Sequence, residues 1–178
     1  MAGQDDGNGS LYPYRIRGRE RSGLVVWVSG ADGSDDRVLT APGADGPRVP
    51  LFVTGRQAAA RLRRGGRALE TPEHHTLELE RVQHWLDDPA RRRTPWGDVL
   101  NAWNFFEDLA RGLSPASGTA VADLLPAQGP VHDSAYHRIF EAPPDRRWTP
   151  AEQRAVIDLL TAGTALWNTC PIVRNPRW

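Results

Sequence analysis

The sequence predicts an α+β fold, in which a small, mostly antiparallel sheet of three to four strands precedes a helical region. Short segments with strand patterning lie within residues 11–53, whereas helix start signals and helical periodicity fill residues 54–178. The clearest helical pattern, over residues 95–113, is expected to form a central helix around which the others pack. A length of 178 residues suits one domain, so we expect a single domain over 11–178, preceded by a disordered leader at 1–10.

Four segments of the N-terminal region are expected to be strands. Residues 23–29 are rich in β-branched and aromatic side chains and lie beside glycines, which is typical of a central strand. Residues 14–17 alternate between polar and apolar, and a hairpin-length connection joins them to 23–29. Residues 37–40 and 49–53 are weaker strand candidates. Pro50 lacks a backbone donor, which favours an edge position for the last of these strands.

Threonine caps mark the expected helix starts. Thr54 and Gln57 match a capping box, in which each side chain accepts a bond from a backbone N–H at the helix start. Three Thr-Pro pairs combine a capping hydroxyl with a proline that tolerates the first helical position, at Thr71, Thr94 and Thr149. Helices are therefore expected at residues 54–64, 72–87, 95–113, 120–125, 134–141 and 150–167. Gly163, on the apolar face of the last helix, indicates close packing.

The helix over 95–113 carries a narrow polar strip. Apolar residues cover well over half of its circumference, so it should pack on two sides. Asparagine is a mediocre helix former, and two in mid-helix indicate a hydrogen-bonding role, either tethering a loop or contacting a partner. Glu107 falls within the apolar arc and needs either an arginine partner at the rim or a polar cleft. The strip consists of Asn101, Asn104, Asp108 and Arg111.

Charge and composition make a nucleic-acid-binding protein the less favoured alternative. The chain has a net charge of zero, and all 22 of its Lys and Arg positions are arginine. Arg61, Arg63, Arg64 and Arg67, together with residues 91–93, could form one basic surface. We keep nucleic-acid binding through that surface as a second alternative function. It is the less favoured one, because duplex-binding domains usually show a strongly basic face.

The sequence also bears on location. No segment approaches the roughly 20 apolar residues that cross a bilayer, so we expect no membrane partner. The polar N-terminal residues do not resemble a secretory signal, and Cys170 is the chain's single cysteine. A lone thiol suits a reducing compartment, and we therefore expect a cytoplasmic protein.

One group of residues could carry metal or acid–base chemistry. Asp133, His137 and Glu141 follow one another at intervals of four, so a helix would align them on one face. Carboxylates around an imidazole suit a metal site, and a small hydrolase centred there is the first alternative function. The same spacing also suits a solvated helix face. Phosphate-loop and dinucleotide motifs do not occur, so we expect no cofactor and lean against an enzyme.

The leading hypothesis is a non-catalytic protein–protein interaction module, for example an immunity or antitoxin-type protein or an accessory subunit. The polar strip of the central helix, with Glu107, is its expected partner surface. We also expect Trp178 to contact the partner, because tryptophan and arginine at the chain's end resemble interface anchors. Trp148, just before Thr149, is expected to be a hydrophobic staple. We expect a protein partner. The sequence specifies neither the identity of this partner nor the oligomeric state of the chain.

Overall fold

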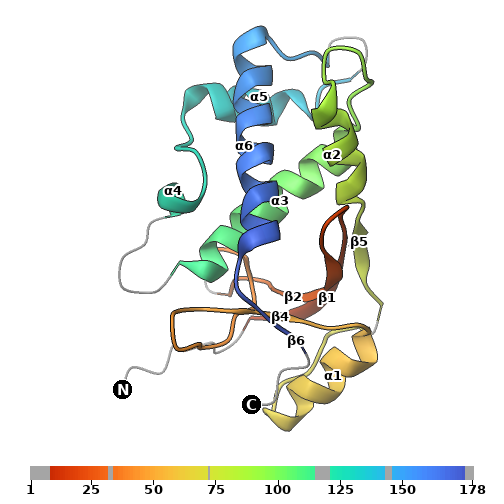
Figure 1. Ribbon diagram of the computed structural model, residues 1–178, viewed down its shortest axis with the longest axis vertical. Helices are drawn as coiled ribbons and strands as arrows, with labels where there is room; N and C mark the ends of the chain where they lie inside the picture. Colours follow the sequence, from red (N-terminus) through yellow and green to blue (C-terminus); the bar gives the residue numbers. More distant parts are fainter. Residues whose placement is uncertain (1–8, 32–33, 72, 115–120, 143–145, 175–178) are drawn as a thin grey trace.

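The computed structural model describes residues 9–31, 34–71, 73–114, 121–142 and 146–174, and it confirms the α+β fold class (Figure 1). Its main sheet has four strands in the order β3-β2-β1-β5. Strands β1 (Leu11–Arg17) and β2 (Ser22–Val28) form the predicted antiparallel hairpin, which runs in register from Leu11 opposite Val28 to Arg17 opposite Ser22. Strand β3 (Arg37–Val38) pairs antiparallel with β2.

The other edge of the sheet corrects the prediction of a helix over residues 72–87. Residues 75–77 form β5 (His75–Leu77), which pairs parallel with β1, and helix α2 (Leu79–Asp87) begins only after it. Leu77 is fully buried opposite Ile16 in the sheet. Burial of this side chain and the ladder hydrogen bonds outweigh the local helix-start signal at Thr71, because tertiary context overrides intrinsic propensity.

A second, two-stranded sheet joins distant parts of the chain. Strand β4 (Val49–Leu51) pairs parallel with β6 (Ile172–Arg174), a strand that the sequence pattern did not predict. Phe52, next to β4, exchanges two backbone hydrogen bonds with Leu24 of β2, at 3.0 and 2.9 Å. The two sheets are therefore continuous through this bridge.

Alternate residues of the sheet serve two separate hydrophobic clusters. Leu24, Val26 and Val28 pack with Ala58 and Leu62 of helix α1 (Gly55–Arg64), which covers one face of the sheet. Ile16, Val25 and Leu77 belong to the larger cluster. It also includes residues of α2, α3 (Trp96–Leu113), α5 (Pro130–Arg138) and α6 (Pro150–Thr169). Figure 1 shows α1 below the sheet and the other helices above it. This period of two follows from strand geometry, in which successive side chains point to opposite faces.

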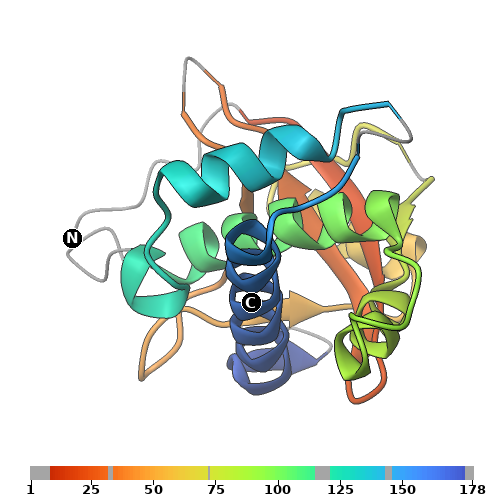
Figure 2. The same ribbon diagram turned by 90° about the horizontal axis from the view of Figure 1, so that it is seen from above.

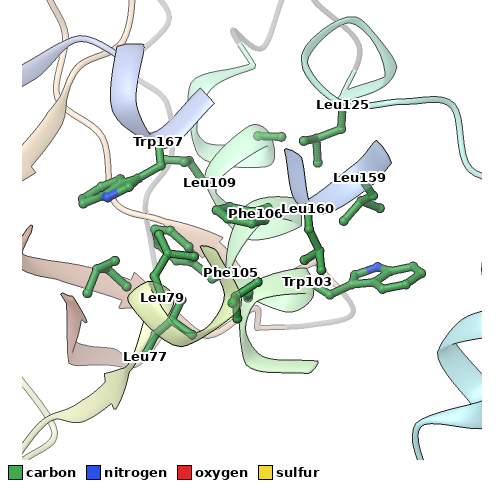
Figure 3. Close-up of a cluster of buried hydrophobic side chains, with 14 of the residues drawn as sticks. Leu77, Leu79, Trp103, Phe105, Phe106, Leu109, Leu125, Leu159, Leu160 and Trp167 are labelled. Carbon is green, nitrogen blue, oxygen red and sulfur yellow. The ribbon is translucent and has the colours of Figure 1, made fainter. Parts of the chain in front are cut away.

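Helix α3 (Trp96–Leu113) packs on two sides, as its wide apolar arc predicted. It lies over the sheet and is crossed by α6 (Pro150–Thr169), which Figure 2 shows end-on. Close approach at this crossing requires a glycine, because a Cβ atom at Gly163 would overlap the ring of Phe106. Figure 3 shows Phe106 of α3 among buried side chains of the same cluster, with Leu159, Leu160 and Trp167 contributed by α6.

The caps divide into confirmed and wrong predictions. Thr54 accepts from the Gln57 backbone at 3.2 Å, and Thr149 with Glu152 forms a full capping box. By contrast, α3 takes Pro95 rather than Thr94 as its N-cap. Between α3 and α6, the described residues form two short helices, α4 (Val121–Leu124) and α5 (Pro130–Arg138). In the part of the chain that is described, no helix combines the length and apolarity that a bilayer crossing requires.

Two side chains, Trp148 and Arg21, connect parts of the chain that are distant in sequence. Trp148 packs against Trp96 with ring centroids 4.4 Å apart and donates its indole N–H to the Ala135 carbonyl at 2.9 Å. Arg21, in the β1–β2 turn, lies over the Trp167 ring and donates to the backbone carbonyls of Trp167 and Cys170 at the end of α6. A cation at a helix C-terminus is favourable because the unpaired carbonyls there are negative.

The α3–α6 crossing leads to a stability prediction. We expect Gly163→Ala to lower the free energy of unfolding by about 1–3 kcal/mol, since the new methyl group must displace the Phe106 ring in a packed core. Gly97→Ala, in the first turn of α3, is the matched control, because a Cβ atom there meets nothing within 4 Å. Urea denaturation should find the control neutral or slightly stabilised. Equal effects of the two substitutions would contradict the close contact.

Candidate binding cleft

The polar strip of α3 forms one wall of a cleft against the main sheet. Asn101, Asn104 and Asp108 lie on successive turns of α3 and line a cavity of about 360 Å³. A volume near 300 Å³ is at the lower end for ligand pockets in proteins. Three of the four residues of the predicted strip therefore line a cavity large enough for one extended side chain or a small molecule, and two of them, Asn101 and Asn104, are also exposed to solvent.

Alternation along the strands supplies the opposite wall. Tyr12 pairs with Trp27 and Tyr14 pairs with His75 in the strand register, so all four side chains lie on the sheet face that α3 covers. The same four residues line the cavity, together with Pro13, Thr76 and Phe105. The Tyr12 and Trp27 rings are 5.4 Å apart, and those of Tyr14 and Phe105 are 6.0 Å apart. The sheet side is thus mainly aromatic.

Asp108 is the buried polar group of the cleft. Its residue is only 9% exposed, and its carboxylate accepts the Trp27 indole N–H at 3.0 Å and an Arg111 N–H at 2.7 Å. Burial raises its pKa from the ordinary 3.8 to about 6, and the nearby Asp36 acts in the same direction. Arg111 and the Trp27 hydrogen bond lower the pKa but do not cancel the effect of burial. The carboxylate is therefore incompletely compensated.

The hydroxyl of Tyr14 is held in its neutral form. Burial raises its pKa to about 12, and the charges of Asp108 and Asp98 add to this shift. A phenol remains a hydrogen-bond donor and acceptor at neutral pH. Tyr14 therefore contributes a ring and a neutral hydroxyl to the cleft, with no negative charge.

Arg111 is shared among three carboxylates. Its guanidinium lies 2.7 Å from Asp108, 3.5 Å from Glu107 and 3.7 Å from Asp35. Its position at the end of the polar strip is therefore explained by ion pairing within the protein. One arginine cannot neutralise three acids, so this end of α3 remains electronegative.

The two asparagines have different surroundings. Asn104 accepts a hydrogen bond from the Tyr136 hydroxyl of α5 at 3.1 Å, which agrees with a tethering role. Asn101 is exposed at the cleft, and among the described residues its amide forms no hydrogen bond. Asn101 is therefore available to a ligand, whereas Asn104 is partly engaged.

The remaining partner-surface predictions lie elsewhere. Glu107 is on the other flank of α3, where it accepts from the Trp103 indole at 2.7 Å and from the Gln128 amide at 2.6 Å. With its ion pair to Arg111, this matches the expectation of a carboxylate that needs an arginine partner. Trp178 lies outside the described residues.

The predicted alignment of Asp133, His137 and Glu141 on one helix face is wrong. Helix α5 ends at Arg138, so Glu141 lies beyond it, and its carboxylate pairs with Arg138 at 3.2 Å. Asp133 and His137 line a separate hollow with Trp103 and His132. Across the residues that can be placed, no three histidine, cysteine or acidic side chains gather as a metal site requires.

The arginine groups do not combine into one surface either. Arg61, Arg63 and Arg64 occupy the last turn of α1, whereas residues 91–93 follow α2. Figure 1 places α1 and the end of α2 at opposite ends of the long axis of the molecule. Arg92 is moreover engaged by Asp87 at 3.5 Å.

Sequence patterning alone did not identify the aromatic wall. The sequence pattern assigns none of Tyr12, Trp27 and His75 to a site. The alternation of β1 and β2 does place Tyr12, Tyr14 and Trp27 on one face. What it does not show is that this face meets the polar strip of α3, because that depends on packing between residues roughly 80 positions apart, as in the bond from Trp27 to Asp108.

The raised pKa of Asp108 makes stability depend on pH. The folded carboxyl binds its proton more tightly than the unfolded chain, so its stabilising contribution is complete below about pH 4 and is lost as pH rises to about 6. We expect Asp108→Asn to gain roughly 2–3 kcal/mol relative to the natural protein between about pH 4 and about pH 7. Urea denaturation of both proteins at the two pH values measures this difference. Parallel pH profiles would show that Asp108 does not titrate in this range.

Comparison with known proteins adds no assignment to this cleft. No family model matches the chain, and neither a curated protein nor a solved structure matches it significantly.

Proposed function

We propose that this protein is a non-catalytic protein-binding module that receives a side chain of its partner in the cleft between α3 and the main sheet. The observation that carries the proposal is the convergence of Asn101, Asn104 and Asp108 with Tyr12 and Trp27 around one cavity. Aromatic rings combined with a few directed polar groups are typical of sites that hold a partner's side chain.

Exposed apolar side chains on α5 and in the turn that follows it support a protein partner. Phe140 is 61% exposed and Val131 is 44% exposed, and both belong to α5 or the turn that follows it. The Phe140 ring lies 5.6 Å from that of Tyr136, whose hydroxyl reaches Asn104 at the cleft. An exposed apolar ring linked to the cleft through Tyr136 and Asn104 fits a protein interface better than a site for a small solute alone.

The proposed class includes immunity or antitoxin-type proteins and accessory subunits. These are proteins that act by occupying a partner and need no catalytic groups of their own. The hydrolase alternative required Asp133, His137 and Glu141 on one helix face, and α5 ends at Arg138, before Glu141.

Site-specific photocross-linking tests the proposal. A p-benzoylphenylalanine residue at position 101 should form a discrete adduct with one protein when the modified chain is expressed in its host. The same residue at position 154, an exposed site on α6, is the matched control and should form no such adduct. Equal adducts at both positions, or none at 101, would contradict the proposed surface.

The partner identified in this way should then bind the purified protein in solution. We expect Asn101→Trp, which fills the cleft from an exposed position, to weaken binding about tenfold or more in calorimetry. Arg154→Trp should leave the affinity unchanged. Circular dichroism and thermal unfolding of the two variants confirm that both are folded, so that a loss of affinity reports on the cleft.

A further inference from the structure

The charges around the cleft favour a cation. Asp108 is an acid within the lining, and Arg111, its ion-pair partner, is shared with Glu107 and Asp35. Asp36 lies near enough to raise the pKa of Asp108. Among the described residues that line the cavity, His75 is the sole base, and it is exposed.

Other cations near the sheet face away or are engaged. Arg15 lies on β1 between Tyr14 and Ile16, so its side chain points to the opposite face, where it donates to the Val53 carbonyl at 2.9 Å. Arg81 pairs with Asp98 at 3.6 Å. A positive ligand therefore meets a carboxylate that Arg111 compensates only in part, whereas an anion gains no free cation from the described lining.

The aromatic wall favours a flat cation. Tyr12 and Trp27 form a tilted pair with centroids 5.4 Å apart, and both are partly exposed. A cation over the face of such rings is attracted by their electrons, and a guanidinium also stacks on them because it is planar. An ammonium group is compact and strongly hydrated, so it gains less from this surface.

The polar groups of the cleft are acceptors suited to guanidinium N–H groups. Asp108 has acceptor capacity beyond its bonds to Trp27 and Arg111, and Asn101 contributes an amide oxygen that no described residue engages. A guanidinium offers five N–H donors in one plane and can reach more than one acceptor at once. A neutral aromatic ligand would add no positive charge to the partly compensated Asp108 carboxylate.

From this combination we infer that the cleft recognises a guanidinium group, the side chain of an arginine presented by the partner. The inference rests on the proposed function for the source of the arginine, but the chemistry of the cleft can be tested without that partner. Tyr12 and Trp27 provide the stacking surface, Asp108 provides the opposite charge, and Asn101 accepts at the entrance. Arg111 is a positioning residue that holds the Asp108 carboxylate.

The experiment uses the full chain and a blocked tripeptide, acetyl-Gly-Arg-Gly-amide, observed by NMR at the indole N–H of Trp27. A Trp27→Phe variant assigns that resonance among those of the seven tryptophans. We expect the arginine peptide to shift it saturably, and the neutral citrulline peptide and the lysine peptide to bind about tenfold more weakly. Citrulline or lysine peptides that bind as tightly as the arginine peptide would overturn the guanidinium assignment, as would the absence of any shift.

Two variants keep the outcome interpretable. Tyr12→Leu removes one stacking face at a partly exposed position and should weaken the arginine peptide about fivefold or more, with the chain still folded. Arg154→Ala on α6 is the control and should bind normally. Unchanged binding to Tyr12→Leu would overturn the stacking role.

The dependence on pH gives an independent test. A bound cation favours the ionised form of Asp108, so affinity for the arginine peptide should fall as pH drops through about 6. His75 also lies in the lining, so a substitution there separates any effect of this side chain from that of Asp108. The decrease should therefore persist in His75→Gln and disappear in Asp108→Asn, and the opposite pattern would overturn the role of Asp108.

The inference and the proposed function can fail separately. Cross-linking of a protein at position 101, together with equal binding of arginine and citrulline peptides, would support the protein-binding module and contradict guanidinium recognition. Selective binding of the arginine peptide without any protein adduct would support guanidinium recognition by the cleft and contradict the proposed protein partner.

Discussion

The contact between Gly163 of α6 and the Phe106 ring of α3 determines how the rest of the molecule is arranged. It lets α3 and α6 cross closely, with the apolar arc of α3 packed against α6 on this side. With one apolar side against α6 and the other against the sheet, the remaining arc of α3 can only face the gap beside the sheet. The position of the polar strip is thus a consequence of core packing.

That packing brings an acid to a place where its charge is unfavourable. Asp108 lies between the aromatic sheet face and Arg111, and burial outweighs the arginine in setting its pKa. Proteins tend to keep such groups where function uses them, because a neutral side chain of similar size would be more stable there. The same burial that costs stability at neutral pH strengthens any electrostatic contact that a ligand makes with this carboxylate.

The sequence predicted local features well and long-range ones poorly. The hairpin, the capping box at Thr149 and the two-sided packing of α3 all follow from patterns within about 20 residues, and all are present. Strands β5 and β6 are only three residues long and exist because they pair with β1 and β4, far away in the chain. The polar half of the cleft was visible as a strip on one helix. Its aromatic half required knowledge of which sheet face that helix would cover.

Similar reasoning explains the failed alignment at Glu141. A spacing of four residues aligns side chains only while the helix continues, and α5 ends at Arg138. Nothing in the local pattern marked that end clearly, because Phe140 and Glu141 are compatible with a longer helix. The ion pair between Arg138 and Glu141 gives the carboxylate a partner of its own.

Arg21 has a consequence for the order in which the chain can fold. It holds the end of α6 from the β1–β2 turn, across 146 positions in sequence, and β4 finds its partner strand only at residues 172–174. During synthesis the N-terminal hairpin therefore emerges long before the residues that complete the second ladder. Contacts of such large sequence separation slow folding and leave strand edges open in the meantime. A growing chain that does not yet include β6 cannot form the β4–β6 ladder, however stable its hairpin is.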